Sequence, residues 1–178
     1  MSETLAITED LSPDNGLWRF AGRLWSRPNA QSAALGLQDL GWSVTDILCA
    51  LWLAEQGKSF KGLDPGPLQL WRSQVTASLR RVRKSIAKNC SATDQARKSV
   101  AQAELDAEKV ELALAFQSLA TGKNLTMAPA EMPIRILALN NLQAATPEPE
   151  QTMDHGTGRL LERLAEELQL LIKMGQQP

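Results

Sequence analysis

The chain has 178 residues, a formal net charge of −1 and a hydrophobic fraction of 43%. This composition is ordinary for a globular protein and excludes a wholly disordered chain. A chain of this length can bury enough surface to fold as one domain without a disulfide or a metal ion. The longest apolar run, residues 47–54, is far shorter than the roughly 20 residues of a membrane-spanning helix. Since the acidic N-terminal residues lack a basic segment, we expect no secretory signal and a cytoplasmic location.

Leucine and alanine dominate the composition, with 28 Leu and 23 Ala against 11 Val and Ile together. Leu and Ala favour helices, whereas β-branched residues favour strands. We therefore predict an all-α fold: a compact helical bundle with a long antiparallel helical hairpin and a C-terminal amphipathic helix. Residues 1–122 should form the helical domain, with core helices at about 13–26, 29–40, 43–56, 65–88 and 92–121.

Residues typical of helix ends mark the first three helices. Ser12 is a suitable N-cap for the first helix, and Pro28 is expected to stop it. Ser43, with Asp46 three residues later, resembles a capping box at the start of the third helix. The third helix is apolar almost all round, which is typical of a helix buried on several sides. We therefore place it at the centre of the fold.

The fourth and fifth helices are predicted to form the hairpin. A break at residues 89–91 is short, and helices joined by a short connection pack as antiparallel neighbours. Pairing about residue 90 places Arg72 near Glu108. The fourth helix carries an apolar seam with the spacing of a coiled coil, formed by Leu68, Trp71, Val75, Leu79, Val82 and Ile86.

The last third of the chain is less regular. Residues 123–158 read as a linker that could hold a short helix at 134–145, with a mobile Pro- and Glu-rich stretch after it. Residues 159–178 form the predicted C-terminal amphipathic helix. Three roles remain open for this helix: docking on its own domain, pairing with another chain, or binding a partner.

Basic residues gather at the predicted hairpin tip, where residues 80–98 hold seven basic residues and one acidic residue. We expect this charge to lack local partners, and such a patch attracts phosphate backbones or acidic protein surfaces. Two alternatives are a solvated helix face and a patch masked by the acidic C-terminal segment. Because no aromatic residue lies between positions 72 and 115, any nucleic-acid contact would be to phosphates and largely independent of sequence. The candidate binding residues are Arg80, Arg81, Arg83, Lys84, Lys88, Arg97 and Lys98.

Residues typical of catalytic and cofactor sites are scarce. His155 is the single histidine, and it lies in the Pro- and Glu-rich stretch. Cys49 and Cys90 lie too far apart in sequence to form a metal-binding pair, and the chain has no Gly-rich phosphate loop. We therefore expect no cofactor and no metal, and a protein that is not an enzyme.

Carboxylates near the central helix keep one alternative open, because a buried carboxylate can have a perturbed pKa. The position of Asp46 is accounted for by helix capping, and that of Glu55 by the end of the third helix. Asp39 has no such structural role and is therefore the carboxylate left as a candidate.

All five tryptophans lie within the first 71 residues, at positions 18, 25, 42, 52 and 71. This clustering favours a Trp-rich core. An alternative is a groove between the first, third and fourth helices that accepts a partner helix or an apolar ligand.

Three segments carry a resemblance to a known family: LWRFAGRLWSRP (17–28), LGLQDLGWSVTDILCALWLAEQG (35–57) and LRRVRKSIAK (79–88). Over roughly residues 16–120 the chain resembles a proteobacterial conserved domain-of-unknown-function family of small all-helical proteins. The resemblance implies no established activity, so it assigns no catalytic residue. The arginine run at 79–83 belongs to the pattern, which favours a role for the tip.

Three functional hypotheses follow from these residues. The first is a non-enzymatic binding module whose basic tip contacts nucleic acid or an acidic protein surface. The second is a protein-interaction adaptor that uses the Trp-rich groove or the C-terminal helix, in a homo-oligomer or with another partner. The third is a small-ligand binder or an enzyme that uses buried carboxylates.

Overall fold

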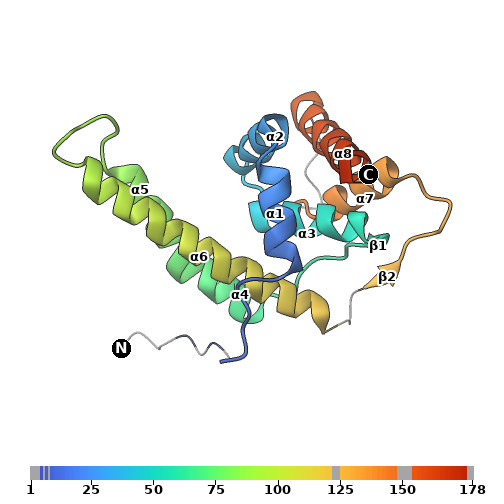
Figure 1. Ribbon diagram of the computed structural model, residues 1–178, viewed down its shortest axis with the longest axis horizontal. Coiled ribbons are helices and arrows are strands. Elements are labelled where there is room, and N and C mark those ends of the chain that lie inside the picture. The colour runs from blue at the N-terminus through green and yellow to red at the C-terminus, as the bar shows by residue number, and fades with distance from the viewer. Residues whose placement is uncertain (1–4, 6, 8, 122–124, 148–153, 176–178) are drawn as a thin grey trace.

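The computed structural model describes residues 5, 7, 9–121, 125–147 and 154–175. These residues form an all-helical fold with one two-stranded sheet, which confirms the predicted fold class (Figure 1). Helix α3 (Val44–Glu55) is packed on several sides by other helices. Ser43 caps it as predicted, because its Oγ accepts a hydrogen bond from the Asp46 N–H at 3.2 Å. The apolar surface of α3 is therefore the centre of the core.

Helices α1 (Gly16–Trp25) and α2 (Pro28–Asp39) pack on α3 and on each other. Asn15, and not Ser12, caps α1, since Asn15 Oδ1 accepts from the Trp18 N–H at 3.0 Å. Ser12 lies too early and donates to the Asp14 carbonyl instead. Pro28 is the first residue of α2, where its fixed φ and missing N–H fit a helix start.

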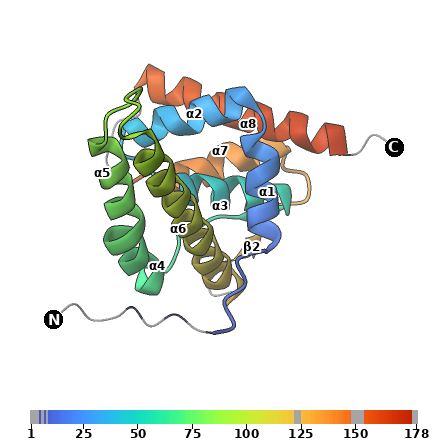
Figure 2. The ribbon, with the colours of Figure 1, turned by 60° about the vertical axis from the view of Figure 1, so that its left-hand side comes forward.

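Helices α7 (Ile134–Ala144) and α8 (His155–Gly175) complete the body. The short helix expected within the linker is thus present. α8 lies along α2 and contacts α7 (Figure 2), with Leu161, Leu164 and Leu168 buried. The C-terminal helix therefore docks on its own chain. It begins at His155, before the predicted start at residue 159, and the Asp154 carboxylate accepts from the Thr157 N–H at 2.6 Å.

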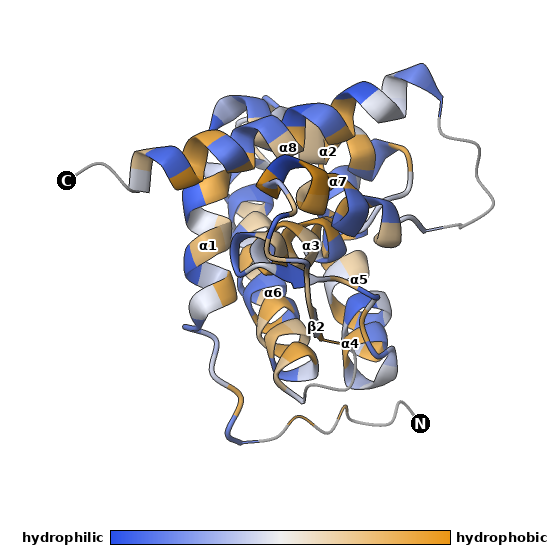
Figure 3. Cartoon of the chain, turned by 90° about the vertical axis from the view of Figure 1, so that its right-hand side faces the viewer, coloured by the Kyte–Doolittle hydropathy of each residue, from blue (hydrophilic) through white to orange (hydrophobic). Residues whose placement is uncertain are grey.

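Two short strands form the one sheet of the described chain. β1 (Lys58–Ser59) pairs antiparallel with β2 (Thr126–Met127), and Lys58 lies opposite Met127. The apolar faces of α3, α7 and α8 meet inside the body (Figure 3). None of the helices in the described part of the chain has the length and apolarity needed to cross a membrane.

Helix α4 (Gly66–Trp71), the π-helical turn η1 (Arg72–Thr76) and helix α5 (Ala77–Ser85) follow one another without a break. A loop at 86–93 then leads into α6 (Asp94–Ala120), which returns antiparallel to α5. Residues 66–120 are called the arm below, and the other helices the body. The arm extends away from the body, with its loop at the far left of Figure 1. The predicted hairpin is present, although α5 ends earlier than expected because Ile86 is extended.

The apolar seam predicted for the fourth helix is not fully buried beyond Trp71, where Val75, Leu79 and Ile86 are half-buried. Val82 is 48% exposed, and α5, which the structure describes throughout, has no buried residue. The cause is η1, where the Ala77 N–H donates to the Arg72 carbonyl five residues back. A π turn holds one residue more than an α turn, so the residues after it are rotated about the helix axis. Thr76, Arg80 and Arg83 consequently lie on the side that meets α6.

Candidate ligand-binding cavity between the arm and the body

A cavity of about 790 Å³ lies between the arm and the body. This volume is within the range of small-molecule sites, about 300 to 1,000 Å³. Trp18 and Trp25 of α1 and Trp42 of the α2–α3 connection line the body side. A second cavity of about 320 Å³ shares Trp25 with the first and extends along the arm to Arg83. The cavity lies where the sequence predicted a groove between the first, third and fourth helices.

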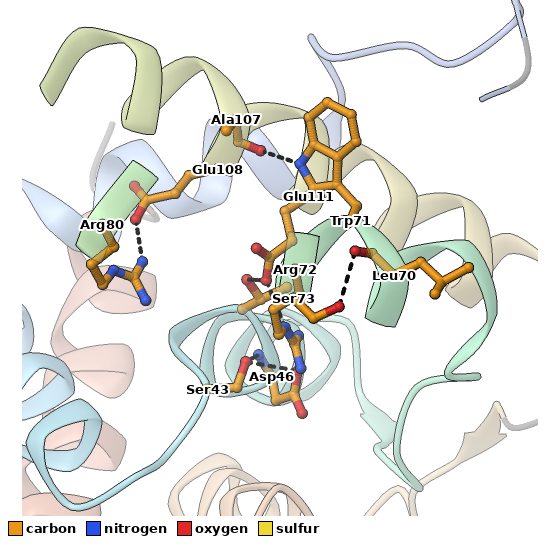
Figure 4. Close-up of polar contacts among 11 residues, drawn as sticks. Ser43, Asp46, Leu70, Trp71, Arg72, Ser73, Arg80, Ala107, Glu108 and Glu111 are labelled. Carbon is orange, nitrogen blue, oxygen red and sulfur yellow. Dashed lines mark hydrogen bonds and ion pairs between the residues drawn. The ribbon is translucent and has the colours of Figure 1, made fainter. Parts of the chain in front are cut away.

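Arg72 of η1 forms the centre of the polar side of the cavity (Figure 4). Its Nη2 donates to Asp46 Oδ1 of α3 at 2.7 Å, and its Nε donates to Glu111 Oε1 of α6 at 2.8 Å. The Thr45 hydroxyl donates to the same Glu111 oxygen at 2.7 Å. One guanidinium therefore joins the body to both halves of the arm.

A second group of ion pairs continues along the arm. Arg80 donates from Nε to Glu104 Oε1 at 3.0 Å and from Nη2 to Glu108 Oε1 at 2.7 Å. Arg83 also pairs with Glu104, through Nε and Nη2. Since α5 buries no side chain, these charged contacts take the place of an apolar seam between α5 and α6.

The two glutamates on this side of α6 differ in their electrostatics. Burial raises the pKa of Glu104, but hydrogen bonds from Arg83 and Arg80 and the charges of both arginines outweigh it, so the pKa lies below its usual value. The pKa of Glu108 lies above its usual value, and burial is the main cause. Arg80 lowers this pKa through its hydrogen bond and its charge, and the charges of Glu104 and Glu111 raise it further. Burial thus determines the direction of the pKa shift at Glu108, whereas the arginine contacts determine it at Glu104.

The charges of Asp46, Arg72 and Glu111 also affect the pKa of Cys49, which lies in α3. Burial raises its pKa well above the usual value, Asp46 and Glu111 raise it further, and Arg72 opposes them. A thiol with a raised pKa remains protonated and is a poor nucleophile. Cys49 is therefore a core residue.

Thr76, the last residue of η1, lines the cavity and is 2% exposed. Its Oγ1 is the one buried side-chain oxygen or nitrogen that lacks a hydrogen-bond partner in the described part of the chain. Leaving a buried hydroxyl unsatisfied costs about 1 to 3 kcal/mol. Unsatisfied buried groups are rare in folded proteins, and π turns within helices are frequent at functional sites.

Four of the seven basic residues predicted as a binding patch have partners within the described chain, and three do not. Arg80 and Arg83 are held by Glu104 and Glu108. Lys98 pairs with Asp94 at 2.7 Å. Arg97 donates from Nη1 to the carbonyl oxygens of residues 83 and 86, which ties the loop to α6. The expectation that the tip charge lacks local partners is therefore wrong for these four.

The physical reason is the register of the hairpin. The two helices are offset from the symmetric pairing about residue 90 that the sequence suggested, so Glu104 and Glu108 come opposite the arginines of α5. Glu111, and not Glu108, pairs with Arg72 for the same reason. The remaining three predicted residues, Arg81, Lys84 and Lys88, are exposed. No ion pair involves these three among the residues that the structure describes.

The sequence did not point to Thr76 and Glu111 of the first cavity or to Glu104 of the second. It also did not give the partners of Arg72. Glu104, Glu108 and Glu111 follow one another at spacings of four and three, which places them on one face of α6. That spacing was the available signal, but it requires the register of α5 to be known. Of the candidate carboxylates, Asp46 lines the cavity, Glu55 pairs with Arg23, and Asp39 is exposed.

Metal-binding residues are not assembled at this site. Across the described ranges, no group of three His, Cys, Asp or Glu side chains is arranged to hold a metal ion. The cavity is instead lined by arginine-paired carboxylates and aromatic rings, which suits an organic ligand.

The fold and the cavity define an all-helical protein with a charged site between a hairpin arm and a helical body. The chain belongs to the family described as protein of unknown function (DUF2390), whose model matches residues 16–114. That range includes the tryptophans, η1 and the acidic face of α6, and so most of the cavity. Neither a curated protein nor a solved structure matches the chain.

Proposed function

We propose that this protein binds a small organic molecule, without transforming it, in the cavity between the arm and the body. The observation that carries the proposal is the cavity of about 790 Å³, which combines apolar walls with a few polar side chains such as Arg72 and Asp46. Thr76, whose buried hydroxyl lacks a partner, is part of its lining. Three tryptophans supply the apolar surface that such a ligand needs.

Binding is favoured over catalysis by the state of the charged groups. The carboxylates of Asp46, Glu108 and Glu111 are engaged by arginines, and Cys49 is held as a thiol. Groups held in this way position a ligand well but are poorly suited to act as a nucleophile or a general base.

The test is ligand-observed NMR and thermal shift of the full chain against a panel of small aromatic and aliphatic compounds. Ala77 lines the cavity, so Ala77→Phe should block it, whereas Gln74→Phe adds the same ring on the exposed side of η1. We expect compounds that bind the wild type and Gln74→Phe but not Ala77→Phe. A panel without binders, or binders indifferent to Ala77→Phe, would contradict the proposal.

A second candidate function is sequence-independent binding of nucleic acid at the arm. It is favoured by Arg81, Lys84 and Lys88, which are exposed on or just after α5 and have no ion pair in the described ranges. Contacts of these three to single-stranded RNA should give a slope of log K against log salt near −2. The same three positive charges would also fit an acidic protein surface as the partner.

This candidate is tested by reversing the three charges. Arg81→Glu/Lys84→Glu/Lys88→Glu should flatten the salt dependence of RNA binding, measured by fluorescence anisotropy. The matched control is Arg159→Glu/Arg163→Glu/Lys173→Glu on α8, which changes the net charge equally. Equal losses in both variants would mean that only the total charge matters, and no binding at low salt would exclude nucleic acid.

The adaptor hypothesis is weaker for the C-terminal helix, because Leu161, Leu164 and Leu168 are buried within the chain's own core. We infer a cytoplasmic location and a bacterial origin from the sequence alone, and both stay predictions.

A further inference from the structure

The carboxylates that line the cavity are only partly used. Asp46 engages Ser43 and Arg72 through Oδ1, Glu111 engages Thr45 and Arg72 through Oε1, and Glu108 engages Arg80 through Oε1. Within the described residues, the second oxygen of each carboxylate accepts no hydrogen bond. Three acceptor atoms at the cavity wall therefore remain available.

The arginines of the cavity use the edge that binds anions most strongly for the chain's own acids, and Nη1 of each makes no hydrogen bond among the described residues. Arg72 and Arg80 each commit Nε and Nη2, the edge that grips a carboxylate or phosphate with two parallel bonds, to the chain's own acids. An incoming anion would have to displace those acids, and the three acids of the lining outnumber the two arginines by one charge.

Aromatic rings at the cavity also favour positive charge, since the face of an indole attracts cations. Lys109 Nζ already lies 5.1 Å from the centre of the Trp18 ring. Trp25 and Trp42 add two further indoles to the lining.

Resting on the proposed function, we propose that the ligand is an organic cation, an ammonium group on an apolar body. The ammonium group lies toward Asp46, Glu108 and Glu111, and the body packs on the tryptophans.

The experiment compares compounds that share a body and differ in charge: 2-phenylethylamine, 2-phenylethanol and 3-phenylpropanoate, and the matching 2-naphthyl series. Affinities for the full chain are measured by tryptophan fluorescence and calorimetry. We expect the amines to bind about tenfold more tightly than the alcohols and the acids to bind least. Binding should be lost in Ala77→Phe and kept in Gln74→Phe.

Charge recognition is isolated by Glu108→Gln, which keeps the shape of the side chain. It should weaken the amines about fivefold and leave the alcohols unchanged. Glu162→Gln, whose carboxylate pairs with Arg135 away from the cavity, is the matched control and should change neither. Thermal unfolding of each variant confirms that it is folded.

The outcomes separate the two proposals. If alcohols or acids bind as well as amines, and Ala77→Phe abolishes their binding, the cavity is a ligand site but the cation inference is wrong. If the amines bind equally to Ala77→Phe or to Glu108→Gln, the cation inference is also wrong. If neither these compounds nor the wider panel binds, both proposals fail.

Discussion

Arg72 Nη2 lies 2.7 Å from Asp46 Oδ1, and this contact joins the π turn of the arm to the first turn of α3. Asp46 serves at the same time in the cap of α3, where its Oδ1 accepts from the Ser43 hydroxyl at 3.0 Å. The start of the central helix and the attachment of the arm therefore depend on one carboxylate. The position of the arm, and with it the cavity, follows from this pair.

Arg72→Met should destabilise the fold. Methionine approximates the length of the side chain but leaves Asp46 and Glu111 without their cation, and breaking a partly buried ion pair should cost about 2 to 3 kcal/mol. Urea unfolding measures the change. Arg19→Met is the control, since the Arg19–Asp14 pair is exposed and should contribute well under about 1 kcal/mol. A loss at Arg72 no larger than that at Arg19 would contradict the role assigned to it.

Glu104→Gln should lower the free energy of unfolding at pH 7 by about 2 kcal/mol, because Glu104 receives charged hydrogen bonds from two arginines. The folded protein holds the pKa of Glu104 below its usual value of 4.5. The stabilisation is thus present above pH 4.5 and is lost as the pH falls through the folded value. The difference in the free energy of unfolding between wild type and variant should therefore become smaller in acid. Urea unfolding at several pH values measures this difference. A gap that is constant with pH would mean that Glu104 acts through shape alone.

Glu108→Gln should show the opposite pH dependence. Its pKa is raised in the folded protein, so its carboxylate opposes folding at neutral pH, and the wild type gains stability relative to the variant as the pH falls through the raised value. We expect little loss at pH 7 and a growing advantage of the wild type toward pH 4.5, near the ordinary value of the group. The same urea series measures it. A loss at pH 7 as large as that of Glu104→Gln would contradict this assignment.

Thr76→Val should stabilise the protein by about 1 kcal/mol, because it replaces an unsatisfied buried hydroxyl by a methyl group of the same shape. For a chain of this size that corresponds to a rise in melting temperature of about 2 to 4 °C. Unchanged stability would show that the hydroxyl is satisfied in solution.

Asn141→Leu should cost about 3 kcal/mol. The Asn141 side chain is 1% exposed, accepts from the Phe60 N–H at 2.9 Å, and donates to the carbonyls of Ala50 at 3.0 Å and Lys58 at 2.9 Å. Leucine fills the space but leaves three backbone groups unsatisfied. Asn140→Leu, at the exposed neighbouring position, should change stability by less than about 0.5 kcal/mol. Equal effects in chemical denaturation would contradict the role of the Asn141 amide.

Much of the body could be predicted from the sequence because its signals are local. Ser43 caps α3 through a residue three positions away, and the all-round apolarity of α3 leads directly to burial. The apolar stripe of α8 likewise predicted an amphipathic helix. Where α8 docks could not be predicted, since many apolar surfaces would accept such a stripe, and the choice of α2 depends on contacts such as that of Glu167 with Arg27 and Asn29.

The arm shows what the sequence by itself does not decide. Its helices and its excess of basic residues are properties of the chain, and both were predicted. The π turn at Arg72–Thr76 and the loop length fix which face of α5 meets α6, and each depends on contacts with residues far away in sequence. One extra residue in a helical turn redirects every later side chain, so Arg80 and Arg83 pair with glutamates and Val82 faces solvent. The sequence alone therefore determined the helices and the charges, whereas tertiary packing decided the partners of those charges and created the cavity between them.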